Sequence, residues 1–213
     1  MKILNIIFFL LIALLSFESK AQSFEGTIKF KTEIETYNDE KNEFKKELEE
    51  RYGDSLLVSF SKTGILKREY LNSSYLGNHI QVYNPAKGIL YLRGKNSLKL
   101  DSIDVKTNSI ENLISKKKIA SERILGLKCE CYEYIGISKY NDTVVLNYCF
   151  SKKTPKINPL LFEKHIDFFL YDYFESSEKP YVRFIIKTDI FKIVQTATEI
   201  KEKQIENTTF EIK

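Results

Sequence analysis

The fold class is decided by the stretch from Phe24 to Tyr37, FEGTIKFKTEIETY, in which apolar and charged side chains alternate. Successive side chains of an extended chain point to opposite faces. One face would carry Ile28, Phe30, Thr32 and Ile34, and the other would carry Lys29, Lys31, Glu33 and Glu35. This pattern predicts a strand of an antiparallel sheet that buries one side only.

Further short strands follow this one at the spacing of hairpins. We expect them at residues 56–61, 65–71, 80–83, 89–92, 98–103, 127–137, 143–150, 182–188 and 191–201, separated by segments rich in turn-forming residues. The strands succeed one another without strand–helix–strand alternation. The sequence therefore predicts an α+β fold that is mainly β, a single antiparallel-sheet domain over residues 22–213 with one or two helices packed on the sheet.

Two segments have helical spacing. In residues 38–52, Phe44, Leu48 and Tyr52 recur every four positions among Glu and Lys, which predicts a charged surface helix, with a long hairpin arm as the alternative. The second helix would start at Asn158 as cap and Pro159 in the first turn. Phe162, Ile166, Phe169 and Tyr173 recur at helical spacing, and we expect Phe162, Ile166 and Phe169 to face the sheet.

Residues 109–118 stay ambiguous. Ile110, Leu113 and Ile114 fit one helical turn, and Lys116-Lys117-Lys118 is most simply a solvated end.

The first 21 residues are typical of a secretory signal peptide. A basic start precedes an unbroken apolar run over residues 6–15, which is shorter than the roughly 20 residues that a membrane-spanning helix needs. Ser19 and Ala21 place small residues at the −3 and −1 positions, so we predict cleavage between Ala21 and Gln22. A buried N-terminal helix or a membrane anchor is the alternative. After cleavage we expect a periplasmic or secreted protein that does not span the membrane.

Charge and residue types exclude several function classes. The formal net charge is +4, and loss of Lys2, Glu18 and Lys20 with the leader lowers it to +3. With no stripe of Lys and Arg, this charge does not indicate nucleic-acid binding. The two histidines, His79 and His165, have no His or Cys at ligand spacing, so we expect no metal site and no cofactor. The absence of a nucleophile elbow and of a Gly-rich phosphate loop makes a hydrolase the least favoured function.

Three cysteines lie in one predicted hairpin, Cys129 and Cys131 on its first strand and Cys149 on its second. If Leu127, Ile135 and Ile137 form the apolar face of the first strand and the even residues 144–150 that of the second, Cys149 points away from the other two. This register predicts three free thiols. A disulfide is the alternative, because nearby cysteines of exported proteins often pair.

The pattern Asp-Ser/Thr-apolar occurs at residues 54–56, 101–103 and 142–144. It resembles the acceptor motif of the general O-glycosylation system of Bacteroidetes-type bacteria, which implies modification of Ser55, Ser102 and Thr143. The alternative is structural, because many strands begin with Asp in a turn followed by Ser or Thr and an apolar residue.

Three stretches resemble exported Bacteroidetes proteins: the leader end Lys20-Ala21-Gln22, the segment from Phe24 to Phe30, and Ile124-Leu125-Gly126-Leu127-Lys128-Cys129. The last is similar to the Gly-Tyr-Lys-Cys stretch of the GLPGLI-type families. Those families distantly resemble the LolA/LolB-like outer-membrane lipoprotein carriers. The resemblance implies a curved antiparallel half-barrel with helices across its concave side.

The resemblance also implies a function. We expect an exported, non-enzymatic binding or carrier protein of the cell envelope, which binds a lipid, an acyl chain or another apolar ligand. Phe162, Ile166 and Phe169 would then form one wall of the cavity. The alternative is a structural or interaction module that binds an envelope protein and no small ligand.

Overall fold

The computed structural model describes residues 23–38, 42–74, 79–95 and 97–212. The predicted signal peptide and its cleavage site between Ala21 and Gln22 lie outside these residues. The described strands are β1 Gly26–Thr36, β2 Ser55–Phe60, β3 Leu66–Leu71, β4 Ile80–Asn84, β5 Ile89–Arg93, β6 Asp101–Asp104, β7 Ile110–Ile124, β8 Leu127–Ser138, β9 Thr143–Ser151, β10 Arg183–Lys187 and β11 Phe191–Glu202. The helical elements are α2 Glu43–Tyr52, η1 Pro159–Phe162, η2 Asp167–Phe169, α3 Leu170–Ser177 and η3 Asn207–Phe210.

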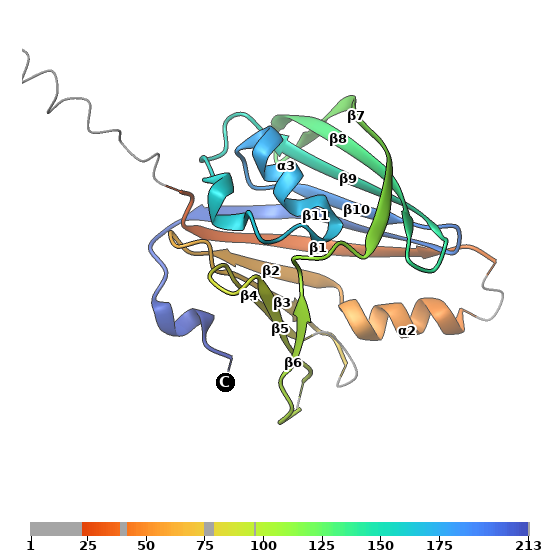
Figure 1. Ribbon diagram of the computed structural model, residues 1–213, viewed down its shortest axis with the longest axis horizontal. Coiled ribbons are helices and arrows are strands. Elements are labelled where there is room, and N and C mark those ends of the chain that lie inside the picture. Colours follow the sequence, from red (N-terminus) through yellow and green to blue (C-terminus); the bar gives the residue numbers. More distant parts are fainter. Residues whose placement is uncertain (1–22, 39–41, 75–78, 96, 213) are drawn as a thin grey trace, which may run out of the picture.

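The strands form one open antiparallel sheet in the order β6-β5-β4-β3-β2-β1-β11-β10-β9-β8-β7 (Figure 1). It consists of two meanders, β1–β6 and β7–β11, which are joined by the pairing of β1 with β11. The edge strands β6 and β7 are connected by residues 105–109, and five residues span at most about 20 Å. The sheet must therefore curl, as the mainly β half-barrel prediction required.

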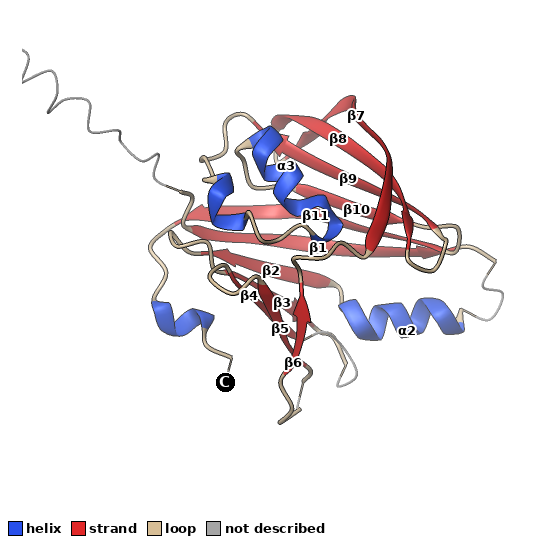
Figure 2. Cartoon of the chain, viewed as in Figure 1, coloured by secondary structure: helices blue, strands red, loops and turns tan. Residues whose placement is uncertain are grey.

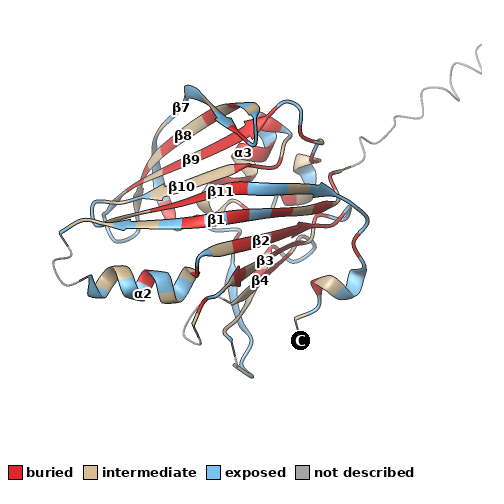
Figure 3. Ribbon diagram, turned by 180° about the vertical axis from the view of Figure 1, so that it is seen from behind, coloured by how far each residue is buried: buried red, intermediate tan, exposed pale blue. Residues whose placement is uncertain are grey.

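β1 has the two faces that its alternating sequence predicted. Ile28, Phe30 and Thr32 are buried, and the charged residues between them, Lys29 and Lys31, are exposed. Figure 3 shows buried residues along the strands β1, β2, β9 and β11 around the middle of the sheet. The apolar side of the sheet is thus the inner side of the curl.

The 3-10 helix η3 lies near the C-terminus, and the other helical elements occupy two places. α3 and the η1 and η2 turns lie across the hollow of the curled sheet, whereas α2 lies apart from them (Figure 2). α2 confirms the predicted charged surface helix: Leu48 is its buried residue, and the ring of Phe44 packs on that of Phe191. Among the described helices, none is long and apolar enough to cross a membrane.

The continuous helix predicted after Asn158 is wrong, although its start is right. The Asn158 side chain accepts a hydrogen bond from the Leu160 N–H, with proline in the first turn. The segment then breaks, because the N–H groups of Ile166 and Asp167 both donate to the carbonyl of Val105 and not to carbonyls one turn earlier. The short 3-10 helix η2 follows this break, and a regular α-helix begins only at α3.

The two residues just before α3 complete the break. Phe168 and Phe169 adopt positive φ angles of 55° and 54°, which no regular right-handed helix contains. The apolar side chains recur every 3.6 residues although the segment is not one continuous helix. The segment still covers the sheet.

The ambiguous segment 109–118 is the first part of the strand β7, and the helical turn considered for it does not form. β7 is an edge strand paired only with β8. Its register shifts three times, between Ile110 and Asn112, between Leu113 and Ser115, and between Ile119 and Glu122. Each irregularity interrupts the period-two pattern, which explains why the sequence did not reveal the strand.

The predicted register of the β8–β9 hairpin is also wrong. Cys131 pairs with Cys149 and Tyr134 pairs with Leu146, so odd residues lie opposite odd residues and even residues opposite even ones. The inner face of β8 is formed by its even residues, since the Tyr134 ring lies 5.5 Å from that of Phe169 in the hollow of the sheet. Cys131 and Cys149 therefore share the outer face and form a disulfide, while Cys129 is a buried free cysteine.

Candidate ligand cavity

A cavity of about 270 Å³ lies between the inner face of the sheet and the segment that precedes α3. Its size is near the lower end of ligand pockets, roughly 300 Å³. Both meanders and the covering segment contribute to its lining, which consists of Tyr52, Arg68, Tyr70, Gln81, Leu90, Leu92, Ile103, Tyr148, His165, Asp167, Phe168, Leu170, Tyr181, Phe184, Ile186, Ile193 and Gln195. The cavity exists only because the sheet curls and brings β3–β6 opposite β9–β11.

Most of the wall is aliphatic or aromatic. The β5 and β6 side contributes Leu90, Leu92 and Ile103, and the β10 and β11 side contributes Phe184, Ile186 and Ile193. Such a wall favours an apolar ligand, because transfer of apolar surface out of water stabilises a complex by about 25 cal/mol per Å².

Arg68 is the cation of this cavity. On the inner face it occupies a row of directly paired residues, Ile28–Val58–Arg68–Gln81–Leu92, which runs across β1 to β5. Burial opposes its charge, but the neighbouring hydroxyls of Tyr181 and Tyr70 outweigh burial and keep its pKa above the ordinary value. Arg68 therefore holds a permanent positive charge inside an otherwise apolar cavity.

His165 lies beside this cation and is neutral. The residue is 3% exposed, and its ring packs on that of Tyr83 at 4.9 Å. Burial, with a further contribution from the charge of Arg68, lowers its pKa to about 3. Neither ring nitrogen has a hydrogen-bond partner among the described residues. The cavity thus contains an unused donor and acceptor near its positive charge.

Asp167, which also lines the cavity, has its own partners. Its Oδ1 accepts hydrogen bonds from the backbone N–H and the hydroxyl of Ser109, at 2.8 and 2.6 Å. These bonds fix the covering segment to the link between β6 and β7. On the other side, the hydroxyl of Tyr148, a residue of β9, donates to the carbonyl of Phe168 at 2.8 Å. The roof of the cavity is therefore attached to the link between the two meanders and to β9.

Of the three residues predicted as cavity wall, none is among those that line this cavity. Phe162 and Phe169 are buried in the core, where Phe162 packs on Tyr83 and Phe169 on Tyr134, and Ile166 is half-buried. Since no continuous helix joins Phe162 to Phe169, this segment contributes His165, Asp167, Phe168 and Leu170 to the wall instead. The predicted residues and the residues that line this cavity thus belong to the same segment but are different side chains.

The sequence also contained an unused signal for Arg68. Within the predicted strand 65–71, Arg68 has the same parity as the apolar Leu66 and Tyr70, which are both buried. Its neighbours Lys67 and Glu69 form an ion pair on the opposite face. A lone charge on the apolar face of a strand indicates a functional group more specifically than the carboxylates of the charged face.

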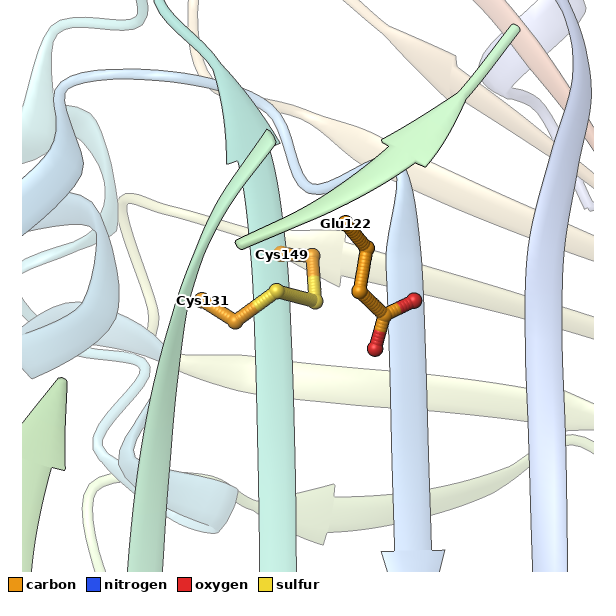
Figure 4. Close-up of side chains that lie close together, drawn as sticks. All are labelled: Glu122, Cys131 and Cys149. Carbon is orange, nitrogen blue, oxygen red and sulfur yellow. A yellow bond between two sulfur atoms is a disulfide. The ribbon is translucent and has the colours of Figure 1, made fainter. Parts of the chain in front are cut away.

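A second group of interest lies on the outer face, around the disulfide (Figure 4). The carboxylate of Glu122, from β7, lies beside Cys131 and Cys149, and it forms an ion pair with Arg183 of β10. Together these three residues are the one grouping of potential metal ligands that the described residues contain. The disulfide consumes both thiols, so the grouping offers a metal only one carboxylate.

The three residues of the proposed glycosylation motif lie at separate positions. Ser102 is exposed on the edge strand β6, whereas Ser55 and Thr143 are the half-buried first residues of β2 and β9. The Ser55 hydroxyl donates to Asp54 at 2.8 Å, as expected where Asp stands in a turn before a strand. Modification of these residues stays a prediction.

Comparison with known proteins gives a limited result. No family model matches the chain, including that of the GLPGLI-type families, and no curated protein matches it. Among solved structures, the chain is similar to a putative outer membrane lipoprotein-sorting protein domain from Vibrio parahaemolyticus. The sequence identity is 9%, the aligned part covers 87% of this chain and 89% of that one, and the TM-score is 0.30.

Proposed function

We propose that this protein is an exported, non-enzymatic binding or carrier protein of the cell envelope, and that it holds an apolar chain in the cavity of its curled sheet. The observation that supports the proposal best is the cavity itself, with its walls of aliphatic and aromatic side chains from both meanders. An apolar ligand would replace water in contact with these side chains. The export rests on the N-terminal sequence.

The tyrosines of the cavity are suited to binding and not to acid–base chemistry. Burial raises the pKa of Tyr148 and of Tyr70 well above the ordinary value, so both stay protonated at neutral pH. The low pKa of His165 likewise keeps this histidine neutral. Since a general acid or base works best with a pKa near the working pH, these groups favour a binding role.

The proposal is tested with Nile red, a neutral dye whose fluorescence rises in apolar surroundings. The strand β10 offers a matched pair of substitutions, because Ile186 lines the cavity and its neighbour Ile185 points to the other face of the sheet. Ile186→Gln places an amide in the apolar wall, at a cost of about 1–3 kcal/mol, and should weaken dye binding about tenfold. Ile185→Gln should leave it unchanged.

Native mass spectrometry of the purified protein provides an independent measurement, because a carrier should retain some of its ligand. If wild-type protein binds no dye and no lipid copurifies, the carrier function is wrong. The alternative is then favoured, a structural or interaction module of the envelope that binds another protein.

A further inference from the structure

Several polar side chains interrupt the apolar wall of the cavity. Arg68 projects from the apolar row of β3, opposite Gln81 of β4, and His165 lies close enough for the charge of Arg68 to lower its pKa. Gln195, on the far side, also lines the cavity. An apolar ligand alone would leave the charge of Arg68 without a counter-ion and both ring nitrogens of His165 without partners, which is costly in a buried site.

The charge of Arg68 has no counter-ion among the residues that the structure describes, because none of their carboxylates forms an ion pair with it. The carboxylate of Asp167 shares the cavity, but its Oδ1 is engaged by Ser109 and by the N–H of Phe168. Arg68 is half-buried, and a partly desolvated cation without an anionic partner is unfavourable. A ligand that supplies the anion reduces this cost.

We propose that the ligand is a single-chain amphiphile with an anionic headgroup, and that Arg68 binds this headgroup while the alkyl chain lies along the apolar wall. The inference rests on the proposed function and specifies the chemistry of the ligand. The planar guanidinium can donate two parallel hydrogen bonds to a carboxylate or a phosphate. His165, which is 3% exposed and has no partner for either ring nitrogen among the described residues, can donate a third.

The size of the cavity favours one chain over two. About 270 Å³ lies between the walls, a space suited to a small ligand. We therefore expect a fatty acid or a monoalkyl phosphate in preference to a diacyl phospholipid.

The test measures displacement of Nile red at pH 7.5 by four C12 amphiphiles below their micelle concentrations: dodecanoate, dodecyl phosphate, dodecanol and dodecylammonium. Wild-type protein should bind at least one of the two anions about tenfold more tightly than dodecanol, and dodecylammonium more weakly than dodecanol. Dodecanoate and dodecyl phosphate together show which anion is preferred.

Arg68→Met keeps an apolar stem and removes the charge. It should lower the affinity for the two anions to that for dodecanol, so that the preference is lost, whereas Arg68→Lys should retain part of the preference. Lys29→Met, on the exposed face of β1, makes the same change in net charge and should have no effect.

The outcomes separate this inference from the proposed function. If wild-type protein binds dodecanol as tightly as the anions, or if Arg68→Met weakens all ligands equally, the anionic headgroup is wrong while the apolar carrier stands. If no amphiphile and no dye binds the wild-type protein, the carrier function itself is wrong. If an Arg68 variant does not fold, the comparison of the four ligands on wild-type protein still decides whether the cavity prefers an anionic headgroup.

Discussion

Mild acid should destabilise this protein through one buried side chain, His165. Its pKa is about 3 in the folded protein, while a histidine in the unfolded chain titrates near 6.5. Between these values the unfolded chain binds a proton that the folded protein does not, so the free energy of unfolding falls as the pH drops below about 6.5. Above this pH, His165 is neutral in both the folded and the unfolded chain, and the free energy of unfolding is not reduced. Toward pH 3 the reduction grows progressively.

The size of the effect follows from the two pKa values. Each pH unit below 6.5 costs about 1.4 kcal/mol, so at pH 5 the contribution of His165 should have decreased by about 2 kcal/mol. The groups around its ring agree with this sign: Arg68 is positive and disfavours a second cation, and Tyr83, whose pKa is raised to about 12, stays neutral.

Urea unfolding at pH 7.5 and pH 5.0 measures the effect. His165→Phe fills the same space with a ring that does not titrate, and it should lose about 2 kcal/mol less than the wild type between the two pH values. His79→Gln, which retains His165, should behave like the wild type. Equal losses for the wild type and His165→Phe would refute the argument, because the acid sensitivity would then come from other groups.

Two further predictions concern covalent and packing features. Under denaturing, non-reducing conditions, thiol titration should find one reactive group, Cys129, and three after reduction; three without reductant would exclude the disulfide. Phe169→Ala removes the ring stacked on Tyr134 and should lower the free energy of unfolding by about 3–5 kcal/mol, whereas Glu163→Ala, at an exposed position, should change it by no more than about 0.5 kcal/mol. Urea unfolding of both variants checks this, and equal losses would contradict the packing described.

The fold was predictable where backbone geometry is regular. The alternation from Ile28 to Glu35 gave β1 and its buried face, and the turn segments gave nearly all of the other strands. β7 escaped detection because its three register shifts break the alternation. Local pattern also failed before α3, because the carbonyl of Val105, far away in the sequence, accepts two hydrogen bonds that a helix would have made internally.

The site was less predictable than the fold. The cavity joins residues of β3–β6 with residues of β9–β11, and only the curl of the complete sheet brings them together. The sequence could show that Arg68 lies on an apolar face, but not which groups oppose it. The cysteines illustrate the same point, since an error of one residue in the β8–β9 register reversed the predicted pairing.

The pairing of β1 with β11 also has a consequence for how the chain folds. Within the meanders β1–β6 and β7–β11, each strand pairs with the next one in the sequence, so most of these pairs form through contacts that are closer in the sequence than the β1–β11 pair. β1 is the first strand to be synthesised, but its second partner, β11, is the last strand in the sequence. Nearly the whole chain must therefore be present before β1 and β11 can pair. Contacts this distant in the sequence slow folding. Until then one edge of β1 exposes unpaired N–H and C=O groups, on which a neighbouring nascent chain could add a strand.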